Sequence, residues 1–273
     1  MENTVKTLRL GLVGKDVSKS LSEEIHTFIL GRLGVQCEYE RISVSKADFD
    51  GAMVRLLGDF DGFNVTIPYK KEVFEYLYEI DNDASACSSV NTVLCDSKKG
   101  YNTDGVGFLL MLYSAGVEVK GKKVLVLGVG GSGSSSALAL KNAGADVYAY
   151  RRNKAELLEI CQRLGVTPVD DAETGGYDML VNCTGVGMHD TEGKSPVEQR
   201  AFVGAKWAVD LIYAPEKSKF LELGESMGAK ILNGKSMLFY QAYFADCLYL
   251  GKQSSVDEAK RLYEEYLQNK SLS

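Results

Sequence analysis

The sequence predicts an α/β protein of two domains, an N-terminal α/β domain and a doubly wound α/β domain, with a deep cleft between them. Strand-like and helix-like patterns alternate along the chain, which favours parallel sheets. Its 273 residues suit one large domain or two ordinary domains. A strand, a glycine-rich turn and a helix, which together commonly begin a doubly wound domain, start near residue 120. We therefore expect one domain of residues 1–104 plus 237–273, and another of residues 105–236.

The elements of the first domain follow from the spacing of its apolar residues. Ile25, Phe28 and Ile29 recur at helical spacing, and Gly34 is a suitable stop for that helix. Short apolar runs bounded by turn residues indicate strands. The expected strands are 8–13, 38–44, 63–67 and 90–95, and the expected helices are 22–33, 46–57, 71–80 and 105–115.

The second domain continues the alternation, and two helices close the chain. Asn153 is a suitable N-cap for the helix that follows it, with Glu156 as its capping partner and Gly165 just past its end. The expected strands are 124–127, 146–150, 178–183, 205–211 and 229–232, and the expected helices are 134–143, 154–164, 236–250 and 255–268.

Residues 123–133, Lys-Val-Leu-Val-Leu-Gly-Val-Gly-Gly-Ser-Gly, carry the strongest functional signal. Glycines at a strand-to-helix turn let the backbone approach a pyrophosphate bound at the helix N-terminus. NAD-binding units often place an acid after the next strand, where it holds the ribose 2′-hydroxyl. Arg151 and Arg152 stand there instead, and two cations suit a 2′-phosphate. The pattern predicts a Rossmann-like domain that binds NADP(H).

Composition narrows the classes of partner. A net charge of −6 argues mildly against nucleic acid, which favours a basic surface. Six scattered cysteines without a C-x-x-C pair indicate reduced thiols and a cytoplasmic protein. Only His26 and His189 could supply imidazole ligands, so we expect no metal site. No apolar run approaches the ~20 residues that cross a bilayer. We expect a small-molecule substrate as partner, with no membrane association.

Polar side chains gather near the ends of the strands of the first domain, where open parallel sheets bind ligands. Hydroxyl and amide groups suit a polyhydroxylated substrate that carries a carboxylate. Lys70 beside Asp104 could protonate the alkoxide that forms when a hydride reduces a ketone. The cluster comprises Ser20, Ser22, Asn64, Thr66, Lys70, Asn91, Thr92, Asn102, Thr103 and Asp104.

In this order, the motifs resemble those of the shikimate dehydrogenase family. The resemblance runs from residue 8 to about residue 250, and its motifs are specific in combination. They are Ser20-Leu21-Ser22 with Ile25-His26, the segments 64–70, 90–92 and 102–105, the turn 128–133, the segments 151–153, 182–188 and 210–215, and Met237-Leu238 with Gln241-Ala242.

The resemblance implies NADPH-dependent, reversible reduction of 3-dehydroshikimate to shikimate, a step of aromatic amino-acid biosynthesis. It implies that Lys70 is the catalytic acid and base, with Asp104 as its partner. The implied substrate-binding residues are Ser20, Ser22, Thr66, Lys70, Asn91, Asp104, Tyr213 and Gln241. The implied cofactor-binding residues are Gly128, Gly130, Gly131, Ser132, Gly133, Arg151, Arg152, Asn153, Thr184, Leu211, Gly234 and Met237.

Some positions depart from the family pattern without removing a catalytic group. They are Lys19 for histidine, Glu23 for proline, Ser88-Ser89 for Gly-Ala, Asn153 for threonine and Ser236 for glycine. Two alternatives stay open. One is a quinate/shikimate dehydrogenase paralogue that accepts NAD, and the other is a catalytically idle sensor that binds NADP or shikimate. We expect a monomer or a homodimer.

Overall fold

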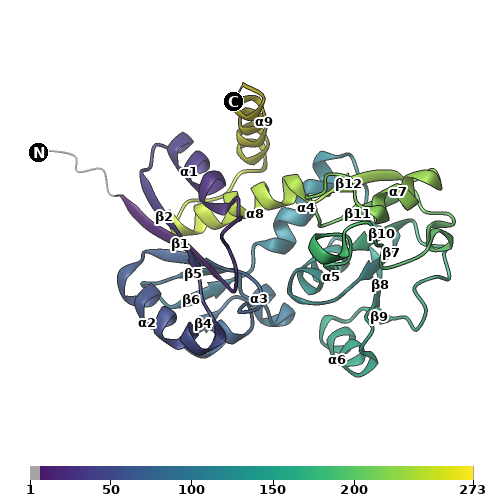
Figure 1. The fold of residues 1–273 in the computed structure, drawn as a ribbon, viewed down its shortest axis with the longest axis horizontal. Helices are drawn as coiled ribbons and strands as arrows, with labels where there is room; N and C mark the ends of the chain where they lie inside the picture. Colours follow the sequence, from purple (N-terminus) through teal and green to yellow (C-terminus); the bar gives the residue numbers. More distant parts are fainter. Residues whose placement is uncertain (1–6, 273) are drawn as a thin grey trace, which may run out of the picture. The chain divides into compact units, whose positions relative to one another are not determined.

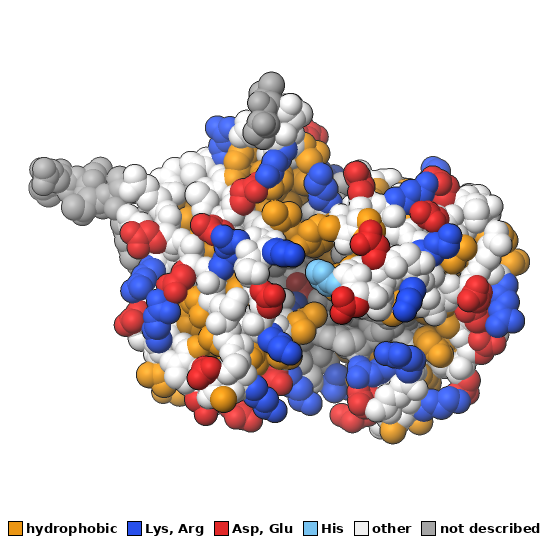
Figure 2. Space-filling model, viewed as in Figure 1, with side chains coloured by type: hydrophobic (Ala, Val, Ile, Leu, Met, Phe, Trp, Pro, Cys, Tyr) orange, Lys and Arg blue, Asp and Glu red, His pale blue; other side chains and the backbone are white. Residues whose placement is uncertain are grey.

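The computed structural model describes residues 7–272, which form two compact units (Figure 1). The first unit holds the chain up to Thr103 and again from Phe239 onward, and the second unit is Asp104–Leu238. Among the described residues, no helix is long and apolar enough to cross a membrane. Acidic and basic side chains are interspersed on the face drawn in Figure 2.

The first unit is built on a sheet of six strands in the order β2-β1-β3-β5-β6-β4. β1 pairs in parallel with β2 and β3, but β5 runs antiparallel to both β3 and β6. The sheet is therefore mixed, which corrects the expectation of a parallel one. A short turn joins β5 to β6, and so short a connection can only link antiparallel neighbours. The strands are β1 Leu8–Gly14, β2 Cys37–Ser43, β3 Gly62–Val65, β4 Glu79–Ile80, β5 Thr92–Leu94 and β6 Lys99–Tyr101.

The expected helix at 71–80 is wrong. Glu72–Tyr76 forms a 3₁₀ turn, and Glu79–Ile80 forms β4. The backbone N–H groups of Tyr78 and Asp81 donate to carbonyls of Lys98 and Gly100, so pairing with β6 replaces helical hydrogen bonds. The α-helices of this unit are α1 Ser22–Arg32, α2 Phe49–Asp59, α3 Asn82–Cys87, α9 Val256–Leu272 and the greater part of α8 Lys235–Tyr249, with a 3₁₀ turn at Lys46–Asp48.

The second unit has a six-stranded parallel sheet in the order β12-β11-β10-β7-β8-β9. Counted along the chain, the strands lie in the order 3-2-1-4-5-6, which is the doubly wound arrangement expected from the sequence. The strand order reverses between β7 and β10, and ligands bind beyond the carboxyl ends of strands at such a switch point. The strands are β7 Lys123–Leu127, β8 Asp146–Tyr150, β9 Thr167–Pro168, β10 Met179–Asn182, β11 Trp207–Asp210 and β12 Lys230–Asn233.

The helices of this unit largely follow the expectation. α4 packs along α5, and α5 begins at Gly131, three residues before the expected start at 134, because glycines 131 and 133 already belong to its first turn. Asn153 caps α6, and Gly165 ends it in the left-handed conformation, as predicted. The α-helices are α4 Asp104–Ser114, α5 Gly131–Asn142, α6 Lys154–Leu164 and the unexpected α7 Lys219–Ser226, with 3₁₀ turns at His189–Thr191 and Gln199–Phe202.

Candidate active site

Asn64 and Asn91 lie at the same edge of the first unit's sheet. β1 and β3 end at this edge, and Asn64 pairs with Leu12 of β1 and with Thr92 of β5. Because β5 is antiparallel, it begins at the edge where its neighbours end. The strand reversal thus places residues 91–92 beside Asn64, although a parallel strand was expected.

A chain of hydrogen bonds joins these buried side chains. The Tyr39 hydroxyl donates to Asn64 Oδ1 at 3.0 Å, and Asn64 Nδ2 donates to Thr92 Oγ1 at 3.3 Å. Thr92 Oγ1 in turn donates to Asn91 Oδ1 at 2.9 Å. Buried amides and hydroxyls need such partners, so the chain fixes the orientation of each side chain.

Asn91 also reaches the C-terminal part of the chain. Its Nδ2 donates to Gln241 Oε1 at 3.3 Å and to Thr103 Oγ1 at 3.0 Å, while its Oδ1 accepts from the Thr103 N–H at 2.9 Å. Gln241 lies on α8, 150 residues away in sequence. The structure therefore brings two predicted substrate residues together, with Thr103 as an additional buried member.

Ser20 and Ser22 form the other end of this polar network. Ser20 Oγ donates to Ser22 Oγ at 3.0 Å and accepts from the Ser22 N–H at 3.2 Å. Ser22 is buried at the start of α1, with its side chain near the Tyr39 hydroxyl. Burial raises the pKa of Tyr39 well above its usual value. Tyr39 thus lies between the serine pair and Asn64, a place that its sequence context does not predict.

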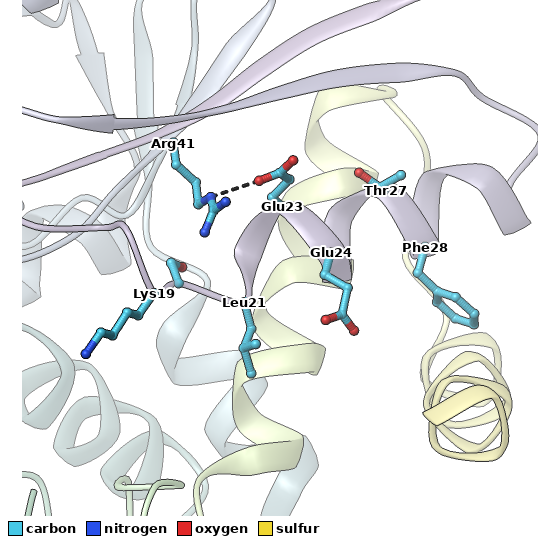
Figure 3. Close-up of a pocket in the computed structure, with 8 residues that line it drawn as sticks. Lys19, Leu21, Glu23, Glu24, Thr27, Phe28 and Arg41 are labelled. Atoms are coloured by element: carbon cyan, nitrogen blue, oxygen red, sulfur yellow. Dashed lines mark ion pairs between the residues drawn. The ribbon is translucent and has the colours of Figure 1, made fainter. Parts of the chain in front are cut away.

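A pocket of about 650 Å³ opens beside Ser20 (Figure 3). Lys19, Glu23 and Arg41 line it, and Arg41 Nε lies 2.8 Å from Glu23 Oε2. Arg41 also donates to the Ser18 carbonyl, so the Glu23–Arg41 pair supports the loop that carries Ser20. Two departures from the family pattern, Lys19 and Glu23, therefore both lie in the wall of this pocket.

Lys70 follows a firmly held turn after β3. The Tyr69 hydroxyl donates to the Val44 carbonyl at 2.7 Å, and its ring stacks on Phe49 with centroids 4.2 Å apart. The Val90 N–H donates to the Lys70 carbonyl at 2.8 Å. The preceding Thr66 is partly buried, as is Lys70 itself. The backbone of Lys70 is therefore fixed, and its pairing with Asp104, which belongs to the second unit, stays a prediction.

Asp104 is the first residue of α4 and is buried. A carboxylate at a helix N-terminus is stabilised by the helix dipole. Ser132 Oγ, in the first turn of α5, donates to Asp104 Oδ2 at 3.1 Å. A side chain at Gly105 would come within 3.1 Å of the Ser135 carbonyl, so glycine permits the close packing of α4 on α5. The predicted catalytic carboxylate therefore lies against the glycine-rich turn.

The turn itself requires glycine. A Cβ at Gly133 would lie 1.9 Å from the Gly128 carbonyl oxygen, whereas one at Gly130 would meet no atom within 4 Å. The partly exposed first turn of α5, which includes Gly131, presents helix N-terminal N–H groups at the switch point. Because its glycines carry no side chains, this turn fits a dinucleotide pyrophosphate. We call residues 128–133 the glycine cradle.

Arg151, the first of the two cations after β8, already has partners within the second unit. Arg151 donates to the Val129 carbonyl at 3.2 Å and forms an ion pair with Glu156. Arg152 is exposed, and Asn153 Oδ1 accepts the Glu156 N–H. The Asn153 side chain therefore caps α6, which is a structural role that does not depend on a ligand.

The loops after β10 and β11 are tied together by Asp210. Asp210 Oδ1 accepts from Asn182 Nδ2 and from the Ile212 N–H, both at 3.0 Å, and Oδ2 accepts from Ser218. Burial raises the pKa of Asp210 to about 6 despite these hydrogen bonds. Thr184, a predicted cofactor residue, donates to Asn182 Oδ1 at 2.6 Å. Asn182 and Asp210 belong to two of the family motifs, but the sequence alone assigns neither of them a role.

Leu211, Gly234 and Met237 lie in the same unit. A Cβ at Gly234 would lie 2.1 Å from the Leu211 carbonyl oxygen, so only glycine allows this backbone approach. Met237 is buried and Tyr213 is partly buried, and burial raises the pKa of the Tyr213 phenol. Within residues 7–272, no three His, Cys, Asp or Glu side chains are placed to hold a metal ion.

The sheet order and the glycine turn define a doubly wound α/β protein of the dinucleotide-binding class. The family model described as the shikimate dehydrogenase substrate binding domain matches residues 12–93. An NADP⁺ shikimate dehydrogenase of Carboxydothermus hydrogenoformans is 35% identical over 256 residues, which cover 88% of this chain and 90% of that protein. The chain belongs to the shikimate dehydrogenase family.

Two solved structures show the same likeness over nearly the whole chain. A chorismate mutase/shikimate 5-dehydrogenase fusion protein of Clostridium acetobutylicum is 33% identical, with a TM-score of 0.87 over 98% of this chain and 100% of that one. The shikimate 5-dehydrogenase of Thermus thermophilus, in complex with NADP(H) and shikimate, is 31% identical, with a TM-score of 0.86 over 94% of this chain and 99% of that one.

Proposed function

We propose that this protein catalyses the NADPH-dependent, reversible reduction of 3-dehydroshikimate to shikimate in aromatic amino-acid biosynthesis. The similarity to NADP⁺ shikimate dehydrogenases over 88% of the chain carries the proposal. The site geometry supports it, because the first unit presents a polar network and the second a glycine cradle. We assign substrate binding to residues 1–104 plus 237–273 and cofactor binding to residues 105–236.

The substrate's carboxylate and hydroxyls find matching groups in the first unit. The Ser20 and Ser22 hydroxyls can donate to a carboxylate, and Tyr213 is proposed to lie near it. Asn91 and Gln241 can exchange hydrogen bonds with ring hydroxyls, as can Thr66. Because Asn91 and Gln241 are already hydrogen-bonded to each other, their amides are oriented before the substrate arrives.

Lys70 and Asp104 are proposed to handle the proton. When bound, NADPH supplies the hydride that reduces the carbonyl carbon. Lys70 in its ammonium form donates a proton to the oxygen left on the substrate, and it takes that proton back in the reverse direction. Asp104 is proposed to hold a substrate hydroxyl as the partner of Lys70.

The cofactor's charges are proposed to meet two features of the second unit. The pyrophosphate lies against the first turn of α5, where Ser132 and the glycine backbone supply donors. The 2′-phosphate lies against Arg151 and Arg152. Thr184, Leu211 and Met237 are proposed to line the nicotinamide end of the site.

A spectrophotometric assay tests the function directly. Purified protein is incubated with shikimate and NADP⁺, and reduced nicotinamide is followed by its absorbance. The assay is repeated with quinate and with NAD⁺. We expect the nicotinamide to be reduced rapidly only when shikimate and NADP⁺ are supplied together. We expect Lys70→Ala to lower kcat about 10²- to 10⁴-fold, the usual worth of a general acid, while shikimate and NADP⁺ still bind.

The same assay separates the alternatives. Comparable rates with quinate or NAD⁺ would indicate a paralogue of broader specificity. Binding of shikimate and NADP⁺ without turnover would indicate a sensor. We further propose that the enzyme is cytoplasmic and works as a monomer or a homodimer, which light scattering on the eluting protein would distinguish.

A further inference from the structure

The first unit contains a buried histidine–aspartate contact that the proposed reaction does not use. His26 Nδ1 on α1 lies 2.6 Å from Asp246 Oδ1 on α8, and the two side chains are 1% and 0% exposed. They are 220 residues apart in sequence. A polar side chain in the core needs a partner, because a buried donor or acceptor left without one costs free energy. The contact therefore fixes α1 and α8 against each other.

Each of these helices carries one end of the substrate-binding network. α1 begins with Ser22, and α8 carries Gln241, five residues before Asp246. A shift of either helix would move the hydroxyl of Ser22 or the amide of Gln241. The His26–Asp246 contact thus sets the separation of two groups that the proposed function assigns to opposite parts of the substrate.

The imidazole also touches the centre of the network. The His26 ring stacks on Tyr39, with centroids 4.8 Å apart and planes inclined by 15°. The Tyr39 hydroxyl donates to Asn64 Oδ1 at 3.0 Å and lies near the Ser22 side chain. The position of the imidazole therefore limits the position of the phenol, and the phenol orients two further site residues.

The His26–Asp246 contact costs free energy of desolvation that apolar side chains in the same place would not cost. Within the described part of the chain, Asp246 Oδ2 and the Tyr249 hydroxyl are buried with no hydrogen-bond partner. Burial raises the pKa of Asp246, and the neighbouring His26 opposes that shift. Apolar side chains of similar volume often stabilise a protein as well as a buried pair does. Core filling alone gives no reason for the pair.

We propose that His26 and Asp246 are positioning residues for the substrate, holding Ser22, Tyr39 and Gln241 in the geometry that binds it. The inference rests on the proposed function, because it concerns the same substrate site. The pair acts on binding of the substrate and leaves the cofactor cradle of the second unit unchanged.

The test is a comparison of full-length variants in the shikimate assay. The double variant His26→Leu/Asp246→Leu replaces the pair with apolar side chains. We expect a melting temperature equal to or above that of the wild type, a KM for shikimate raised about tenfold, and a KM for NADP⁺ within twofold of the wild type. We expect kcat to stay within about threefold, since Lys70 and Asp104 are untouched.

Two further variants keep the test decisive. Asp246→Asn preserves shape and an acceptor for the imidazole, so it should fold and raise the shikimate KM by about threefold. Tyr243→Phe is the matched control, because it removes the hydrogen bond from α8 to Glu258 on α9 and lies outside the network. It should lower stability without changing the shikimate KM.

Specific outcomes would overturn the inference. One is a folded double variant or Asp246→Asn variant with the wild-type KM for shikimate. Another is a KM for NADP⁺ that rises in parallel with it. A wild-type protein that neither turns over nor binds shikimate would refute the proposed function itself, and this inference with it.

Discussion

The hydroxyl of Ser132 lies 3.1 Å from Asp104 Oδ2 and donates a hydrogen bond to it. Ser132 belongs to the glycine-rich turn and Asp104 begins α4, so one contact joins the cofactor cradle to the proposed catalytic carboxylate. Both residues lie in the second unit. The orientation of Asp104 is therefore set by the same turn that is proposed to receive the pyrophosphate.

Replacing Ser132 with alanine should impair turnover through Asp104. A hydrogen bond to a charged group is worth about 1.5–3 kcal/mol, so we expect kcat/KM for shikimate to fall at least about tenfold. Ser135→Ala is the matched control, because the Ser135 hydroxyl donates within its own helix, to the Gly131 carbonyl. Steady-state kinetics, with NADP⁺ binding measured separately, would check this. Equal losses in the two variants would contradict it.

Two glycines of the turn should respond differently to alanine. At Gly133 the new Cβ collides with the Gly128 carbonyl, so Gly133→Ala should distort the turn and lower both stability and NADP⁺ affinity. At Gly130 the Cβ has room, so Gly130→Ala should keep the melting temperature and lose affinity only if a pyrophosphate approaches there. Calorimetric titration with NADP⁺ and thermal melts separate the two effects. A well-folded Gly133→Ala protein with normal affinity would refute the cradle.

Glu156 should weaken NADP⁺ binding by occupying Arg151. Its carboxylate pairs with that guanidinium and would repel a 2′-phosphate. Because the pair is partly exposed, we expect Glu156→Gln to lower the KM for NADP⁺ only about threefold and to leave the KM for NAD⁺ unchanged. Glu159→Gln, which removes a partner of Arg163 on the same helix, is the control. An equal effect on both cofactors would exclude the 2′-phosphate as the cause.

Asp210 should make stability fall as pH rises through the acidic range. Its pKa is about 6 in the folded protein, against an ordinary value near 3.8. Between these values the native state holds a proton that the unfolded chain has released, so this group's contribution is fully present below pH 4 and is lost by about pH 6. The loss is on the order of 3 kcal/mol.

Asp210→Asn cannot lose that proton, so its free energy of unfolding relative to the wild type should rise by a similar amount between pH 4 and pH 7. Urea unfolding at several pH values measures the difference. A difference that does not vary with pH would show that Asp210 titrates normally.

Local patterns were enough to predict much of the second unit. The glycine turn, the capped helix after Asn153 and the alternation of strands and helices each depend on neighbouring residues. The helix predicted at 71–80 is wrong because a contact with a distant part of the chain decides the structure there. The pairing of Tyr78 with Lys98 outweighs the weak helical pattern of the segment. The antiparallel direction of β5 was likewise decided by its hairpin, which no apolar periodicity reveals.

Contacts between distant parts of the chain could not be predicted in the same way. Nothing near His26 in the sequence indicates a buried carboxylate partner 220 residues later. Nothing in the sequence distinguishes Tyr39 from the other aromatic residues, but in the fold its hydroxyl donates to Asn64. The site residues from the family motifs stay proposals for ligand contact, although the structure brings Ser20 next to Ser22 and Asn91 next to Gln241.

Because β5 runs in the reversed direction, the turn that joins it to β6 lies away from the site and can accept an insertion. β5 leaves the site edge at Thr92, turns back after Leu94 and returns through β6, so that residues 102–104 follow directly after it. The hairpin turn at 95–98 therefore lies at the far edge of the sheet. Insertions between Asp96 and Ser97, the exposed residues of this turn, such as a short flexible tag or a fluorescent label, should lengthen the loop without moving either end of the polar network.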